Sequence, residues 1–107
     1  IHCDEFQTQG TAKIAERIKK RVGNNPLYLS IDIDVLDPAF APGTGTPEIA
    51  GMTTREMVNV LRGLSGMNLI SADVVEVSPA YDHAEVTSLA AATIVYELTN
   101  LFAKKNQ

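Results

Sequence analysis

Hydrophobic positions recur with helical spacing in three parts of the chain. Over residues 11–22 they fall at Ala15, Ile18 and Val22, and Gly23 follows in the usual position past a helix end. A second helix is predicted from Thr53 onward, with a buried face of Met57, Val60, Leu61 and Leu64. A third is predicted over about residues 85–103, with one face of Ala91, Ile94, Val95, Leu98 and Phe102.

Two apolar stretches between these helices predict β-strands. The first covers residues 27–33 and is apolar on both faces until its aspartates, which is typical of a strand buried on both sides. The second covers residues 68–77. Residues 1–3 resemble the end of a further strand. The alternation of strands and helices predicts an α/β fold with a parallel sheet.

Three acidic side chains stand at the carboxyl ends of these strands. Asp32 and Asp34 should point to the same side of the first strand, about 6.6 Å apart at Cα. Two neighbouring carboxylates repel each other unless a cation or a proton lies between them, so the pair is a candidate site for a hard metal ion. The alternative is a pair of solvent-exposed strand-end caps. Glu76, at the end of the second strand, is expected at the same sheet edge, as a cation-binding substrate contact or in a structural salt bridge.

A long loop, residues 35–52, follows the first strand. Loops of this length are usually functional or disordered, and its three prolines favour a stiff, functional loop. Asp37 is predicted to hold the loop rather than to bind a metal. Residues 42–47 could form a rigid turn or line a pocket, and we favour the pocket. Thr53 and Glu56 form a capping box, with Met52 and Met57 placed as a hydrophobic staple.

The composition of the chain argues against several classes of function. The 107 residues correspond to one domain or part of one, and the net charge of −4 with no basic patch beside aromatic residues argues against nucleic-acid binding. No apolar run approaches the roughly 18 residues of a membrane span, so no membrane association is predicted. The single Cys3 suits a reducing compartment, so a cytoplasmic location is expected, with a mitochondrial one left open. No glycine-rich nucleotide-binding motif is present.

Three motifs resemble those of a known family. The segments Ser30-Ile31-Asp32-Ile33-Asp34-Val35-Leu36-Asp37-Pro38, Pro42-Gly43-Thr44-Gly45-Thr46-Pro47-Glu48 and Val75-Glu76-Val77-Ser78-Pro79 resemble the ureohydrolase superfamily of arginases and agmatinases. The second segment, and the continuation through Ala80-Tyr81-Asp82, is more similar to agmatinases. The resemblance covers about residues 28–102. It implies a three-layer α-β-α fold with a parallel sheet and a binuclear manganese centre.

The resemblance also implies roles for individual residues. Asp32 resembles the bridging metal ligand, Asp34 a ligand to one of the two Mn²⁺ ions, Thr46 a residue beside the guanidinium pocket, and Glu76 the carboxylate that binds the guanidinium group. The family's remaining ligands and its proton-shuttle histidine are expected upstream, so no catalytic residue is assigned here. Residues 1–107 are therefore expected to be the C-terminal part of a single ureohydrolase domain, inactive in isolation.

The implied reaction is manganese-dependent hydrolysis of a guanidino compound. Agmatine, giving putrescine and urea in polyamine biosynthesis, is the expected substrate, and the family implies a homo-oligomer. Another ureohydrolase activity, on guanidinobutyrate or arginine, remains open. So do an unrelated Mg²⁺-dependent transferase using the Asp-x-Asp pair and a non-catalytic interaction module.

Overall fold

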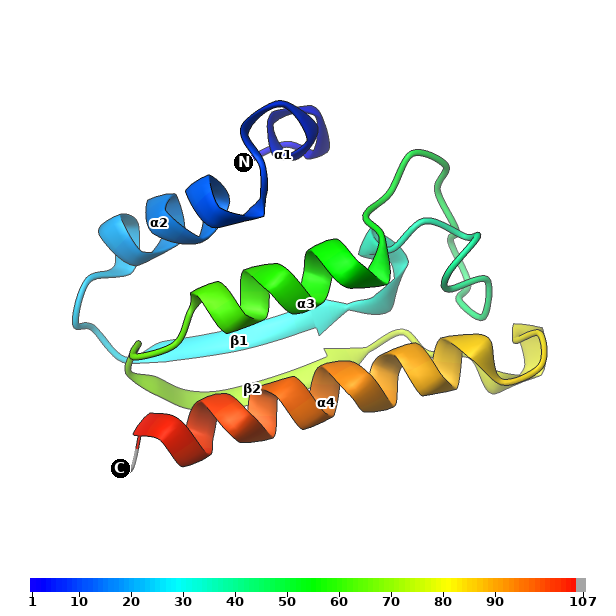
Figure 1. The fold of residues 1–107 in the computed structure, drawn as a ribbon. Helices are drawn as coiled ribbons and strands as arrows, with labels where there is room; N and C mark the ends of the chain where they lie inside the picture. The colour runs from blue at the N-terminus through cyan, green and yellow to red at the C-terminus, as the bar shows by residue number, and fades with distance from the viewer. Residues whose placement is uncertain (106–107) are drawn as a thin grey trace.

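The computed structural model describes residues 1–105, which form a two-stranded sheet with helices packed along it (Figure 1). The elements are, in order, α1 (Cys3–Gln9), α2 (Thr11–Val22), β1 (Leu27–Asp32), α3 (Thr54–Gly63), β2 (Leu69–Val75) and α4 (Val86–Lys105). Short 3₁₀ turns follow each strand, at Ile33–Val35 and Pro79–Tyr81. The predicted helices and strands over residues 11–105 are thus confirmed, with small shifts of their ends.

The two strands are parallel, as predicted. Leu27 pairs with Leu69 and Asp32 with Val75, so both strands end at the same edge of the sheet. Helix α3 provides the crossover between them and packs against α4 and α2 (Figure 1). Burial of β1 on both faces is not seen in this part of the protein, because the strand alternates and Tyr28 is 55% exposed. The described residues therefore contain the sheet and its helices on one face.

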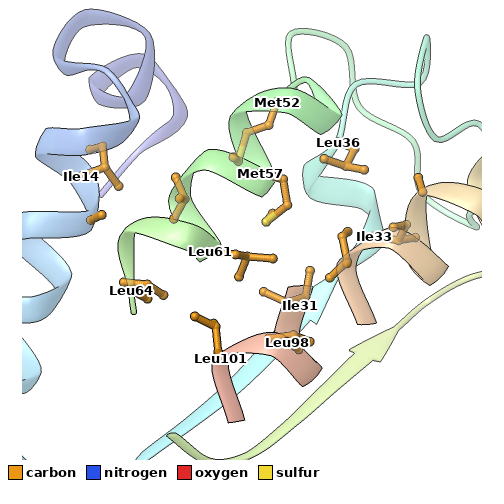
Figure 2. Packing of buried hydrophobic residues seen from close by; sticks show 14 of the residues in the cluster. Ile14, Ile31, Ile33, Leu36, Met52, Met57, Leu61, Leu64, Leu98 and Leu101 are labelled. Carbon is orange, nitrogen blue, oxygen red and sulfur yellow. The ribbon is translucent and has the colours of Figure 1, made fainter. Parts of the chain in front are cut away.

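The core lies between the sheet and the helices (Figure 2). Its completely buried side chains include Ile33, Leu36 and Leu61. The predicted buried face of α3 is confirmed in full: Met57, Val60, Leu61 and Leu64. In α4 the prediction is wrong for Val95, which is 50% exposed. The buried stripe follows Ile94, Leu98 and Leu101 at i, i+4 and i+7, and Val95 lies beside it.

The predicted strand at residues 1–3 is wrong. These residues lead into helix α1, which begins at Cys3. The backbone N–H of His2 donates to the Glu5 carboxylate at 2.7 Å, and Asp4 and Glu5 place negative charge in the first turn, where a helix favours it. Phe6 then buries its ring in the core. The acidic first turn was the sequence signal for this helix.

The start of α3 follows the predicted capping box. The Thr53 hydroxyl accepts from the backbone N–H of Glu56 at 3.1 Å, and the Glu56 carboxylate accepts from the N–H of Thr53 at 2.8 Å. Met52 and Met57, the predicted staple, are both buried (Figure 2). This cap fixes where the long loop ends and α3 begins.

Helix α4 corrects one sequence expectation. By length and composition it is long and apolar enough to cross a membrane, although no such run was predicted. The same test is passed by core helices of water-soluble proteins, so it is weak evidence. Here α4 packs against β2 and α3, and its buried residues are Thr87, Ala90, Ile94, Glu97, Leu98 and Leu101. Within the described residues α4 packs one face on the core, and 39% of its apolar window is buried.

A salt bridge joins α3 to α4. The Arg62 guanidinium donates three hydrogen bonds to the Glu97 carboxylate at 2.7–3.2 Å, and Glu97 is only 6% exposed. These hydrogen bonds hold the pKa of Glu97 below its usual range, against the opposing effect of burial. The pair therefore stabilises the ionised form of Glu97 in the folded chain.

This salt bridge should make stability depend on pH. Because the pKa of Glu97 is lower in the folded than in the unfolded chain, its contribution is fully present above the unfolded value, about 4.5, and is lost as pH falls through the folded value. We expect the free energy of unfolding of the 107-residue chain to decrease as the pH is lowered beyond about 5. In Glu97→Gln this decrease should be less steep. Urea denaturation followed by circular dichroism measures this. Glu16→Gln, at an exposed position on α2, is the control, and equal slopes for all three proteins would contradict the assignment.

Helices α2 and α3 approach each other closely at Gly63. A Cβ atom at this position would lie 2.6 Å from the Cβ of Ala15. Since real Cβ contacts are not this short, the two helices would have to move apart to admit even a methyl group.

The variant Gly63→Ala should therefore destabilise the chain by about 1–3 kcal/mol, although alanine is the better helix former. The compensating pair Ala15→Gly/Gly63→Ala should recover most of the loss. Thermal denaturation measures both. Asn59→Ala, at an exposed position of α3, is the control for helix propensity and should be neutral or stabilising. A Gly63→Ala protein as stable as wild type would show that the helices do not need this contact.

Candidate active site

The carboxyl end of β1 carries two of the candidate residues. Asp32 is the last residue of the strand, and Asp34 lies in the 3₁₀ turn that follows. The prediction that both project from one strand is therefore wrong, because the strand ends between them. The backbone N–H of Asp34 instead donates to Oδ1 of Asp32 at 3.1 Å. This bond keeps the two residues adjacent at the sheet edge.

Thr46 is brought to this edge by the long loop. Its hydroxyl donates to Oδ2 of Asp34 at 3.0 Å. Thr46 is exposed and Asp34 is half-buried, so the bond lies at the surface of the strand end. The structure thus joins Asp32, Asp34 and Thr46 in one hydrogen-bonded cluster, although Thr46 is twelve residues from Asp34 along the chain.

Glu76 stands one strand away. It follows Val75, the register partner of Asp32, and its side chain is exposed. Its backbone has φ = 68°, a left-handed conformation that residues other than glycine adopt rarely and at a cost. The ends of both strands, the long loop and the start of α4 meet at this end of the molecule (Figure 1). The predicted shared edge is confirmed.

Metal ligation requires more than these acids supply. Over residues 1–105 there is no group of three or more His, Cys, Asp or Glu side chains that could hold a metal ion. The donor set at the strand end nevertheless fits Mn²⁺, because Asp32 and Asp34 both offer carboxylate oxygens, which this ion accepts. The pair can therefore form part of a coordination shell and needs further ligands.

Asp37 holds the loop, as predicted. Its Oδ1 accepts from the N–H of Ala39 at 2.9 Å, and its Oδ2 accepts from the N–H groups of Ala50 and Gly51 at 3.0 and 3.3 Å. A Cβ at Gly51 would lie 2.6 Å from the backbone nitrogen of Asp37, so the two loop ends touch. This carboxylate closes the loop that carries Thr46.

Asp82 was missed by the sequence reasoning. Its carboxylate accepts hydrogen bonds from the N–H groups of His83, Thr87 and Ser88 and from the Ser88 hydroxyl, at 2.9–3.2 Å. Burial raises the pKa of Asp82, but the hydrogen bonds from Thr87, Ser88 and His83 outweigh it and hold the pKa well below its usual range. An aspartate before a helix, followed by Thr-Ser in its first turn, was the available signal.

The remaining polar groups and the groove between the helices lie outside the candidate site. The hydroxyls of Tyr28 and Ser30 donate to the Asp73 carboxylate on the exposed face of the sheet. These two hydrogen bonds lower the pKa of Asp73, and the bond between Tyr28 and Asp73 raises the pKa of Tyr28. His83, in the turn before α4, is exposed. A groove of about 500 Å³ between α3 and α4 has none of the candidate residues in its lining, so it lies apart from the acidic edge.

The loop also contains an isolated polar atom. The Thr44 side chain is buried, and its hydroxyl has no hydrogen-bond partner among the residues described. A buried hydroxyl in this state costs free energy. The preceding residue, Gly43, is buried as well, whereas residues 45–50 are exposed. The loop therefore has a buried first half and an exposed tip, and the predicted pocket along residues 42–47 remains a prediction.

Comparison with known proteins identifies the family. The sequence model described as the Arginase family matches residues 1–100. The chain belongs to the arginase family. The predicted resemblance to arginases and agmatinases is thereby confirmed.

Individual members of the arginase family are similar over nearly all of this chain. Agmatinase from Photorhabdus laumondii is 49% identical over 107 residues, covering 100% of this chain and 35% of that protein. Guanidinopropionase from Pseudomonas aeruginosa is 50% identical over 104 residues, covering 97% of this chain and 33% of that protein. The solved structure of proclavaminate amidino hydrolase from Streptomyces clavuligerus has a TM-score of 0.96 and 45% identity, covering 98% of this chain and 36% of that one. The chain thus has the arginase-like α/β fold and spans about a third of the length of these relatives.

The role of Asp37 can be tested by its removal. Asp37→Ala deletes the acceptor for three backbone N–H groups and should destabilise the chain by about 1–3 kcal/mol. It should also make residues 38–51 more accessible to proteolysis. Limited proteolysis with mass spectrometry measures this, with Glu48→Ala, at an exposed loop position, as the control. Unchanged cleavage of the loop in Asp37→Ala would contradict the assigned role.

Proposed function

We propose that the protein containing this chain is a cytoplasmic, manganese-dependent ureohydrolase that hydrolyses agmatine to putrescine and urea. The observation that carries the proposal is the hydrogen-bonded cluster of Asp32, Asp34 and Thr46, one strand away from Glu76. The chain's membership of the arginase family supports the reaction class. A homo-oligomeric assembly is part of the same proposal.

Asp32 and Asp34 would hold two Mn²⁺ ions together with ligands from outside the described residues. When bound, such a pair of ions supplies a nucleophilic water at neutral pH and stabilises negative charge in the transition state. Thr46 donates to one oxygen of Asp34 and leaves the other free to bind, so it fixes the orientation of that carboxylate.

Glu76 would bind the guanidinium group of the substrate. A planar guanidinium pairs with a carboxylate through two parallel N–H···O bonds, which fix both its position and its plane. The strained backbone at Glu76 supports a functional role, since residues in such conformations cluster at binding sites. Its exposed side chain beside the end of β1 is accessible to a ligand bound there.

A second substrate class has specific support. The 50% identical relative from Pseudomonas aeruginosa is a guanidinopropionase, and the 45% identical structure is a proclavaminate amidino hydrolase. The two names indicate a guanidino and an amidino substrate that differ in the rest of the molecule. Guanidinopropionate therefore joins guanidinobutyrate and arginine as an alternative to agmatine.

The proposal is tested with protein expressed from its complete reading frame. After metal removal and reloading with Mn²⁺, urea release is measured with agmatine, guanidinobutyrate, guanidinopropionate and arginine. We expect the highest kcat/KM with agmatine. A higher value with another of these compounds would change the substrate, and no urea from any of them would overturn the enzymatic proposal. The 107-residue chain alone should release no urea, because it has only part of a metal shell.

The role of Glu76 gives a sharper prediction. Glu76→Gln keeps the shape but removes the charge, so kcat/KM should fall by about 100-fold, equivalent to about 2.7 kcal/mol of lost charge-assisted binding. Steady-state kinetics measure this. Glu48→Gln, at the exposed loop tip, is the matched control and should retain wild-type kinetics. Equal kinetics for both variants would remove Glu76 from the substrate site.

A further inference from the structure

The turn before α4 holds two residues in a strained conformation. Ala84 and Glu85 have φ values of 50° and 60°, in the left-handed region that favours glycine. The Asp82 carboxylate bridges this turn, because one oxygen accepts from the N–H groups of His83 and Thr87 and the other from Ser88. Each strained residue costs free energy and persists only where its surroundings enforce it. Asp82 supplies that enforcement from both sides of the turn.

The loop rests on the same turn at Gly43. A Cβ at Gly43 would lie 2.8–2.9 Å from the Cβ, Cα and Cγ atoms of Asp82, so no other residue fits without displacement. The N–H of Gly43 donates to the hydroxyl of Thr87 at 2.8 Å, and Thr87 is 0% exposed. The carbonyl of Gly43 accepts from the N–H of Ser78 at 2.8 Å. The Gly43 backbone is thus held by two segments at once.

These contacts lead directly to both substrate-site candidates. Gly43 stands three residues before Thr46, whose hydroxyl donates to Asp34. Ser78 stands two residues after Glu76. A shift of the turn at Asp82 would therefore disturb the contacts of Gly43 on both sides of the site and change the separation between Thr46 and Glu76.

We propose that Asp82 is a positioning residue for the guanidino group. Through Thr87 and Gly43, Asp82 sets the separation of Glu76 from the Asp34–Thr46 pair. The inference rests on the proposed ureohydrolase function and extends it to a residue that does not touch the substrate. A guanidino group bound by Glu76 must also lie correctly against the Asp34–Thr46 pair, so a residue that sets the spacing of these side chains controls affinity.

The test uses Asp82→Asn in the protein from its complete reading frame. Asparagine keeps the size but directs an NH₂ group at N–H donors, so one side of the turn loses its acceptor. We expect KM for the best guanidino substrate to rise at least tenfold, with kcat within about threefold. Thr87→Val, which cannot accept from Gly43, should do the same, whereas Thr87→Ser should retain a wild-type KM. The double variant Asp82→Asn/Thr87→Val should be no worse than the stronger single variant.

Controls separate positioning from general stability. Gly63→Ala forces α2 and α3 apart, away from the long loop and from this turn, and should lower Tm without changing KM. An unchanged KM in Asp82→Asn would overturn the inference. The same KM rise in Gly63→Ala at an equal loss of Tm would overturn it too.

Amide hydrogen exchange supplies a readout without substrate. In Asp82→Asn, the amides of Gly43 and Ser78 should exchange faster, while amides in the middle of α3 keep their protection. Unchanged exchange at both amides would overturn the inference even if the wild-type protein released no urea. Conversely, absent urea release with faster exchange at these amides would overturn the proposed function and leave the coupling between the turn and the loop supported.

Discussion

The hydrogen bonds of Asp37 determine whether the long loop can act as part of the site. Residues 35–52 leave the end of β1 and return beside it, where Leu36 and Met52 form a bridge and the N–H of Asp37 donates to the carbonyl of Met52 at 2.8 Å. The Asp37 carboxylate then caps the returning backbone at Ala50 and Gly51. Because closing a loop of this length costs conformational entropy, these bonds offset that cost at the one place where both ends meet.

A second contact restrains the middle of the loop. Gly43 lies against the turn that starts α4, and its carbonyl binds the segment that follows β2. The loop is therefore fixed at its two ends and at one point between them, on three separate elements of the fold. Thr46, a candidate binding residue, is therefore carried by a loop whose path is restrained at several points. In this chain the arrangement places the Thr46 hydroxyl against the Asp34 carboxylate at the end of β1.

The sequence was sufficient where periodicity extends over several turns or strand residues. It located α2, α3, α4 and both strands, and the capping box set the start of α3. It failed for α1, which has seven residues, too few for a helical period to appear. It also placed Asp32 and Asp34 on one strand, since Ile-Asp-Ile-Asp alternates like a strand even though a 3₁₀ turn begins at Ile33. Asp82 was missed because the contact that shows its importance, with Gly43, joins residues far apart in the chain.

The division of the loop into a fixed part and an exposed tip has an evolutionary consequence. Pro47, Glu48 and Ile49 are exposed, and Ile49 is 80% so. None of them provides the side-chain contacts that close the loop, which come from Asp37, nor those at Gly43. Substitutions at the tip can therefore accumulate without altering the backbone path, because the contacts that fix this path are made elsewhere in the loop.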